Sequence, residues 1–454
     1  MALLLFFAIC LLLLLGYPVA FTLAGGGLIF AGIGTLTGHF DPVLLKTLPA
    51  RLYGILNNPI LMAVPLFVFM GTVLEKSKIA EQLLTSMADL FGRYRGGLIF
   101  SVFFVGMLLA ASTGIVGATV VTMGLMSLPS LLKRGYDPSF SAGAICATGT
   151  LGQIIPPSIA LILLGDVMSN AFQQAQLTMG IFSPKSVSVG DLFAGALVPG
   201  VILVGLYCLY TLFLIITKPE RFPKPTDTVS FTSSFWLKVC SSLLPPLILI
   251  LMVLGSILLG IATPTEAASV GGAGALIIAF TKRQLSFKAL QEVMISTVKI
   301  TSMVFLILIG ASIFSLVFRG LGGEELIQHL FSNMPGGKVG ATLLVMLVIF
   351  LLGFILDFIE ITFVVVPLVA PILLAMGIDP VWLGIMIAVN LQTSFLTPPF
   401  GFALFYLRGV ASDKVSSQQI YKGVIPFVMI QLLLMILLSV FPQLILWLPT
   451  QIYG

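Results

Sequence analysis

The most informative feature of this sequence is its shortage of charged residues. Only 9% of the 454 residues are Asp, Glu, Lys or Arg, whereas 58% are hydrophobic, and the mean hydropathy is +1.15. A soluble core does not require so much apolar surface, so this composition indicates a polytopic membrane protein. The basic residues behind the net charge of +5 sit in short runs between apolar stretches, which argues against nucleic-acid binding.

Cysteine and histidine are also scarce. The four cysteines lie in or beside apolar stretches and form no Cys-x-x-Cys pair, so we predict neither a disulfide framework nor a transition-metal site. We find no Ser/His pair, no paired acids on separate spans and no metal-ligand spacing, which argues against an intramembrane enzyme. A proton-translocating subunit of a respiratory complex would need Lys, Glu and His residues in a chain at mid-membrane, and the sequence lacks one.

Two polar stretches that end in tandem prolines interrupt otherwise apolar segments. One runs from Gly149 to Pro157, and the other from Asn390 to Pro399. Tandem prolines remove two amide donors and clash with the preceding turn, so we expect broken helices at about 139–165 and 381–407. Unwound backbone at membrane depth must be buried in protein or line a cavity. The two breaks are therefore the best sequence indication of a site for a small solute or an ion.

Two long apolar blocks precede the breaks. The block at about 98–132 has a small, polar middle, and the block at about 339–375 carries Asp357 and Glu360 near its middle. We expect each to form a helical hairpin that re-enters the membrane. Between the blocks, Lys282 to Lys299 suggests an amphipathic interfacial helix, followed by a separate span at about 300–318.

The two halves of the chain match at residues that break or cap helices. Three pairs share one offset of 242 positions (398 − 156), namely Pro156 with Pro398, Asp137 with Asp379, and Pro129 with Pro371. The first hairpin is flanked by basic residues on both sides and the second is not, so equivalent loops favour opposite sides of the membrane. We predict an inverted repeat of residues 1–217 and 240–454, joined by a cytoplasmic linker at 218–239. This orientation places Lys46 and Arg51 outside, against the positive-inside bias.

Several stretches together resemble the large membrane (M) subunit of tripartite ATP-independent periplasmic (TRAP) transporters. They are Ile60 to Phe67, Lys133 to Pro138, Ile154 to Ile159, Thr263 to Ala268, and Leu396 to Gly401. The resemblance implies a multi-pass protein of the bacterial inner membrane that works as a sodium-driven elevator transporter. It further implies a small four-helix membrane subunit and a periplasmic binding protein that delivers an organic anion, usually a carboxylate. The hairpin tips, Ser112 to Gly117 and Leu356 to Glu360, differ from many relatives and resemble a subgroup associated with 2-oxo acids and other monocarboxylates.

Sodium ions are the only cofactor that we expect. Sodium wants about five or six oxygen ligands, which unwound backbone and nearby hydroxyls can supply. The candidate ligands form two clusters, Ser112, Thr113, Gly114, Gly149 and Thr150 in the first half, and Gly353, Asp357, Thr393 and Thr397 in the second. The alternative is that these small residues only let helices approach closely.

The candidate substrate-binding residues flank the same breaks. They are Gln153, Pro156, Asn390, Gln392, Ser394, Pro398 and Glu360. Two alternatives stay open, because the amides and hydroxyls can satisfy backbone groups and the two acids of the second hairpin can cap its second helix. Asp137, Asp379 and Glu266 are expected to be helix caps. A stand-alone sodium-coupled carboxylate carrier, which needs no binding protein, is the alternative function.

Overall fold

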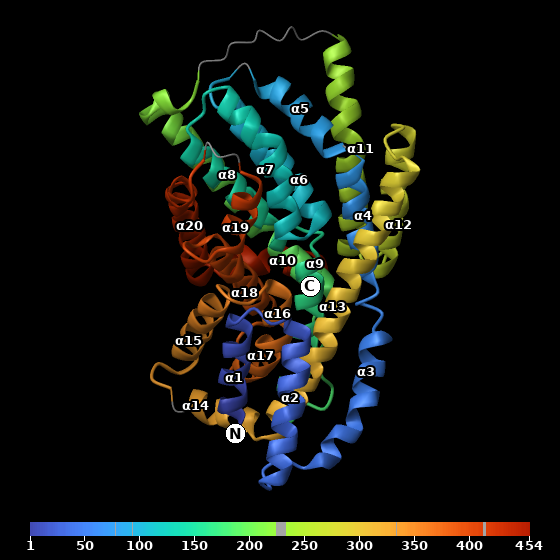
Figure 1. The fold of residues 1–454 in the computed structure, drawn as a ribbon, viewed down its shortest axis with the longest axis vertical. Helices are drawn as coiled ribbons and strands as arrows, with labels where there is room; N and C mark the ends of the chain where they lie inside the picture. Colours follow the sequence, from blue (N-terminus) through green and yellow to red (C-terminus); the bar gives the residue numbers. More distant parts are fainter. Residues whose placement is uncertain (78, 93, 224–232, 333, 412–414) are drawn as a thin grey trace.

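The computed structural model describes residues 1–77, 79–92, 94–223, 233–332, 334–411 and 415–454. All regular secondary structure within these ranges is helical, as the sequence predicted (Figure 1). The predicted linker at 218–239 lies partly outside the described residues, which lack 224–232.

The described part of the first half forms ten α-helices and three short 3₁₀ helices. In order these are α1 (Ala2–Leu14), α2 (Val19–Leu36), η1 (Pro42–Thr47), α3 (Leu48–Leu56), α4 (Ala63–Lys76), α5 (Ile79–Phe91), α6 (Gly97–Thr113), α7 (Val116–Lys133), α8 (Pro138–Thr150), η2 (Leu151–Gln153), α9 (Ile159–Thr178), α10 (Val189–Thr217) and η3 (Pro219–Arg221). The predicted first hairpin corresponds to α6 and α7, and the predicted first broken helix to α8, η2 and α9.

The second half contributes α11 to α21. These are α11 (Ser233–Leu258), α12 (Pro264–Thr281), α13 (Phe287–Gly320), α14 (Gly323–Ser332), α15 (Gly337–Leu352), α16 (Phe358–Val364), α17 (Val366–Ala375), α18 (Pro380–Leu396), α19 (Phe402–Val410), α20 (Ser417–Val440) and α21 (Gln443–Tyr453). The predicted second hairpin is α15 followed by α16 and α17, which meet at a bend of 56°. Its broken helix is α18 and α19.

Length and composition identify the helices that can cross a bilayer. Among the described residues, six qualify, or seven if the bent pair of α16 and α17 counts as one span. The six are α2, α7, α10, α11 from Phe235 onward, α13 and α20. Large apolar side chains such as Phe213, Ile277 and Phe280 are exposed on the helix surfaces. Such a surface suits contact with lipid, so the chain is a multi-pass membrane protein.

Capping residues fix several helix starts as predicted. The Asp137 carboxylate accepts a hydrogen bond from the Ser139 amide at 3.2 Å, and Asp379 accepts one from the Trp382 amide at 2.9 Å. Thr263 and Glu266 form a reciprocal capping box at the start of α12, where Pro264 occupies the first helical position.

The predicted interfacial helix followed by a separate span was wrong. Residues Phe287–Gly320 form one continuous helix of 34 residues, α13. No proline lies between Phe287 and Arg319 to break the chain of helical hydrogen bonds, and lysines do not interrupt them.

The helices form two groups that meet along α4 and α13. The scaffold helices, α2, α4, α11, α12 and α13, pack against one another, with α4 contacting both α12 and α13. In Figure 1, α4, α11, α12 and α13 stand along the right side. The hairpin helices, α6 to α9 and α15 to α19, form the second group, which α10, α20 and α21 border.

Candidate functional site

The first helix break is buried and packs against the tip of the first hairpin. Helix α8 ends at Thr150, η2 continues to Gln153, and α9 begins only at Ile159. The Pro156–Pro157 peptide bond is cis, and both rings are buried. The Ser158 hydroxyl donates to the Gly152 carbonyl at 2.6 Å, so this hydroxyl satisfies one carbonyl of the unwound stretch.

The second break is shorter than predicted. Helix α18 runs without interruption to Leu396, and the unwound segment covers only Thr397 to Gly401. The Pro398–Pro399 bond is also cis, but Pro399 and Phe400 are exposed where the first break is buried. The expectation that the unwinding begins at Asn390 was therefore wrong, and Asn390 to Ser394 are helical residues.

The two hairpin tips use different turn chemistry. Gly114 ends α6 in the left-handed region, with φ of 61°, and an added Cβ there would lie 2.8 Å from the Ile159 amide nitrogen. Asp357 and Glu360 form a capping box at the start of α16. The Asp357 carboxylate accepts from the Phe358 amide at 2.7 Å, and Glu360 accepts from the Asp357 amide at 2.9 Å. Both acids therefore cap the helix, which was the alternative interpretation.

Both tips border one small cavity against the scaffold helices. This tip cavity has a volume of about 130 Å³. Its lining includes Gly114 and Ile115 of the first tip, Asp357 to Ile359 of the second, Gln153 of the first break, Val68 of α4, and Ile300, Met303 and Val304 of α13. The structure thus brings together three of the predicted site residues, Gly114, Gln153 and Asp357. Glu360 does not line the cavity.

Gln153 is the polar side chain that the protein leaves unsatisfied at this cavity. It is 1% exposed, and neither its amide nitrogen nor its amide oxygen has a hydrogen-bond partner. Leaving a buried amide unpaired costs free energy of about 1–3 kcal/mol. A ligand or an ion in the tip cavity would recover part of that cost.

Among the described residues, five other predicted sodium ligands do not line the tip cavity, namely Gly149, Thr150, Gly353, Thr393 and Thr397. Gly149 packs closely on Val120 of α7, and Gly353 packs on Ser394 of α18. The hydroxyls of Thr393 and Thr397 donate to carbonyls one turn back, at 2.8 Å and 2.7 Å. Ser112 and Thr113 are the last residues of α6, and their side chains lie outside the described residues.

Thr150 takes part in a buried polar network instead. Its hydroxyl donates to the Ala147 carbonyl at 2.9 Å and accepts from the amide groups of Gln392 and Gln431, at 3.4 Å and 3.5 Å. Gln431 also donates to the Tyr207 hydroxyl at 2.8 Å. The Thr150 hydroxyl is thus directed toward protein groups in this conformation.

Gln431 and Tyr207 were missed by the sequence analysis. Gln431 lies in the apolar part of α20, twelve residues after Gln419 of its first turn, and is fully buried, as is Tyr207 of α10. A polar side chain inside a membrane span is itself a functional signal, and it was the one available here.

Two of the predicted substrate residues of the second break, Asn390 and Ser394, bind backbone instead. Asn390 donates to the Met346 carbonyl at 2.7 Å, and Ser394 donates to the Phe350 carbonyl at 2.7 Å. Both acceptors lie one turn apart on α15, so this pair fastens α18 to the first helix of the second hairpin. Of the two predicted prolines, Pro156 is buried beside the first break, and Pro398 is half-buried.

The helices that follow the breaks exchange partners between the halves. Helix α9 packs on α17 of the second hairpin, whereas α19 packs on α7 of the first. The helices before the breaks stay with their own hairpins, α8 with α6 and α7, and α18 with α15.

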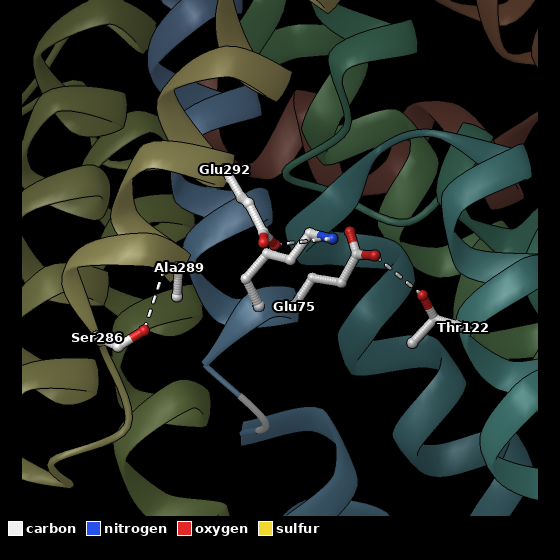
Figure 2. A network of polar contacts seen from close by, with 6 residues as sticks. Glu75, Thr122, Ser286, Ala289 and Glu292 are labelled. Carbon is white, nitrogen blue, oxygen red and sulfur yellow. Dashed lines mark hydrogen bonds and ion pairs between the residues drawn. The ribbon is translucent and has the colours of Figure 1, made fainter.

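A polar contact joins the scaffold helices to the first hairpin. Glu75 of α4 accepts from the Thr122 hydroxyl of α7 at 3.2 Å, and Figure 2 shows its carboxylate pointing toward Thr122. The next residue, Lys76, lies 3.9 Å from Glu292 of α13. The two consecutive charges thus contact different helix groups.

The chain matches the family model described as "Tripartite ATP-independent periplasmic transporter, DctM component" over residues 6–444. Relatives include the C4-dicarboxylate TRAP transporter large permease protein DctM of Vibrio cholerae, which is 29% identical, with 99% of this chain and 98% of that protein covered. The ectoine TRAP transporter large permease protein TeaC of Halomonas elongata is 28% identical, with 96% of each covered. A putative TRAP transporter large permease protein of Haemophilus influenzae is 30% identical, with 86% of this chain and 91% of that protein covered.

Two solved structures share the fold. The YdaH transporter of Alcanivorax borkumensis matches with a TM-score of 0.63 at 16% identity, covering 96% of this chain and 98% of that one. MtrF of Neisseria gonorrhoeae, which is described as illuminating a class of antimetabolite efflux pumps, matches with a TM-score of 0.60 at 14% identity, covering 88% of this chain and 83% of that one. Because the family model covers nearly the whole sequence, the chain belongs to the DctM family, the large permease component of TRAP transporters.

Proposed function

We propose that this permease subunit imports a small organic anion, a carboxylate, in symport with sodium ions. The observation that carries the proposal is the tip cavity, where both hairpin tips, the first break and the scaffold helix α13 converge. A cavity at this boundary can be exposed to either side of the membrane when one helix group moves against the other.

The tip cavity contains groups that suit sodium and a carboxylate. Gly114, Gln153 and Asp357 all line the cavity. We propose that the Asp357 carboxylate, the unpaired amide oxygen of Gln153 and a backbone oxygen of the Gly114 turn would bind the sodium ion. The sodium proposal therefore rests first on Gly114, Gln153 and Asp357. The unpaired amide nitrogen of Gln153 would donate to a carboxylate.

Sodium would supply the driving force for uptake. Each net charge that crosses a membrane potential of about 100 mV releases about 2.3 kcal/mol. Two net charges would then support roughly a 10³-fold substrate gradient, before the sodium concentration gradient is counted.

For the transport cycle we propose an elevator movement. The hairpin helices would move as one body against the scaffold helices, because the exchanged packing of α9 and α19 ties the two hairpins together. The inverted repeat is part of this proposal. Thr150 and Gln392 are separated by the same 242 positions as the repeat, and they contact each other at 3.4 Å. Equivalent positions meet in this way near an axis of pseudo-symmetry.

We further propose that the protein works in the bacterial inner membrane with two partners, a small four-helix membrane subunit and a periplasmic substrate-binding protein. The names of the relatives support this assembly, because TRAP denotes a tripartite periplasmic transporter. The isethionate TRAP transporter permease protein DctMQ of Oleidesulfovibrio alaskensis supports it further. That protein is matched over only 64% of its length by 95% of this chain, so it carries additional sequence.

Uptake into proteoliposomes tests the proposal. The vesicles would contain the chain with its cognate small subunit, and the binding protein would be added outside with a panel of radiolabelled carboxylates. We expect accumulation that requires an inward sodium gradient and the binding protein. Sodium-dependent uptake without the binding protein would favour the alternative, a stand-alone carboxylate carrier. A protein that moves no carboxylate under any of these conditions would refute the proposal.

A further inference from the structure

A second, larger cavity lies between α3, α9 and α13, and none of the predicted site residues lines it. This outer cavity has a volume of about 430 Å³, which is enough for a small organic acid. Its polar lining consists of Arg51, Asn58, Asp166, Asn170, Gln174, Ser312 and Ser315. Helix α3 lies toward the end of the molecule opposite α5 (Figure 1).

The outer cavity contains one cation and one acid. Arg51 is half-buried, and no carboxylate among the described residues forms an ion pair with it. Asp166 is 9% exposed, and its carboxylate accepts a hydrogen bond from the Asn58 amide at 2.9 Å. The cavity thus offers a guanidinium that is free to bind a carboxylate, and a fixed acceptor for a hydroxyl group.

The two cavities lie along the same pair of helices. Helix α9 lines the tip cavity with Ala160 and the outer cavity with Asp166, and α13 lines them with Val304 and Leu308. At about 1.5 Å of rise per residue, these pairs are separated by roughly 9 Å and 6 Å along the helix axes. A solute in the outer cavity is therefore one to two helical turns from the tips.

A site for an anion would also explain an anomaly in the sequence. The predicted orientation places Arg51 outside, against the positive-inside bias. A role in attracting an incoming anion into a cavity would explain why a basic residue lies on that side.

We propose that the outer cavity is an entry site for a small monocarboxylate that also carries a hydroxyl group. Arg51 binds the carboxylate with paired hydrogen bonds, and Asp166, held by Asn58, accepts from the hydroxyl. A dicarboxylate is disfavoured, because its second charge would face Asp166. This inference rests on the proposed function, since it names the substrate class and the step before the tip cavity.

The test measures occupancy of the outer cavity directly, in the full-length chain reconstituted with its cognate small subunit. Asn170 is exposed and lines the cavity, so an Asn170→Cys variant can be labelled with a charged maleimide at increasing concentrations of lactate. Cys240 is exposed and does not line the cavity, so its labelling is an internal control. We expect lactate to protect Cys at position 170 in a saturable manner and succinate to protect much less, with no change at Cys240.

Three further substitutions test the roles of Arg51 and Asp166. In the Asn170→Cys background, Arg51→Gln should raise the protecting lactate concentration about tenfold, because a charge-assisted pair is lost. Lys46→Gln is the matched control, since Lys46 is an exposed cation on the same connection outside the cavity, and it should shift the midpoint less than twofold. Asp166→Asn should reduce the difference between the concentrations of lactate and of succinate that protect Cys at position 170 from labelling.

The possible results separate this inference from the proposed function. Absence of lactate protection in a protein that still takes up carboxylates with sodium would overturn the entry site alone. Equal shifts for Arg51→Gln and Lys46→Gln would overturn the role of Arg51, and stronger protection by succinate would overturn the ligand class. Loss of all sodium-dependent uptake in the unmodified protein would instead refute the proposed function. If Arg51→Gln does not fold, lactate protection at position 170 in the otherwise unmodified chain still decides whether the entry site exists.

Discussion

The packing of Gly353 against Ser394 leads to a quantitative prediction about the second hairpin tip. An added Cβ at position 353 would lie 2.5 Å from the Ser394 hydroxyl oxygen and 2.9 Å from its Cβ. The backbone of Gly353 is in the ordinary helical region, with φ of −65°. Alanine is therefore opposed there only by the side chain of Ser394, and overpacking of this kind costs about 1–3 kcal/mol.

A double-mutant cycle separates this clash from other effects. Ser394→Gly alone should cost about 2 kcal/mol, made up of roughly 1 for the hydrogen bond to Phe350 and roughly 1 for glycine in a helix. If the clash is the cause, adding Gly353→Ala to Ser394→Gly should cost nothing more. The coupling free energy then equals the cost of the clash, about 1–3 kcal/mol.

The measurement is the free energy of unfolding of the four proteins in mixed micelles, together with sodium-dependent uptake. Gly205→Ala is the control, because an added Cβ in α10 meets nothing within 4 Å. Additive costs for the two substitutions, or a Gly353→Ala variant as stable and active as Gly205→Ala, would refute the packing argument.

Three other changes test contacts at the site. Glu360→Ala should destabilise the protein by about 1 kcal/mol through loss of the capping box, and Glu360→Gln, which keeps the hydrogen bond, should recover most of it in thermal unfolding; equal losses would contradict a capping role. Gln431→Leu should lower the free energy of unfolding by about 1–3 kcal/mol, because it leaves the Tyr207 hydroxyl unpaired. Adding Tyr207→Phe should restore the stability. If it does not, loss of that hydrogen bond is not the cause. Thr122→Val removes the hydrogen bond to Glu75 and should lower the population of the conformation in which α4 contacts α7. Spin labels on α4 and α7 would report this as a changed distance distribution. The control is Thr217→Val at the exposed end of α10, and an unchanged distribution in both variants would contradict the prediction.

The sequence predicted helix ends well where local chemistry decides them. The capping residues Asp137, Asp379 and Glu266 all act as expected, because a side-chain oxygen near free helix amides has few alternatives. The extent of unwinding before each pair of prolines was harder to predict. Gly149 and Gly152 weaken the helix before the first pair, whereas the residues from Asn390 to Leu396 include no glycine and stay helical.

The individual contacts of the site were not predictable from the sequence. Asn390 and Ser394 bind carbonyls on α15, and this depends on the distance between two helices rather than on any local pattern. The outer cavity joins Asn58 to Asp166, which is 108 positions away, and no periodicity connects them. The only sequence signal for that cavity was Arg51, which the predicted orientation places outside, against the positive-inside bias.

Because α9 packs on the second half and α19 packs on the first, neither half can complete its packing before the other is present. During synthesis the first half must wait, with the face of α9 that contacts α17 unprotected, until the second half has been inserted. Severing the chain between residues 223 and 233 should thus yield two fragments that are each prone to degradation alone, yet reassemble when they are produced in the same cell.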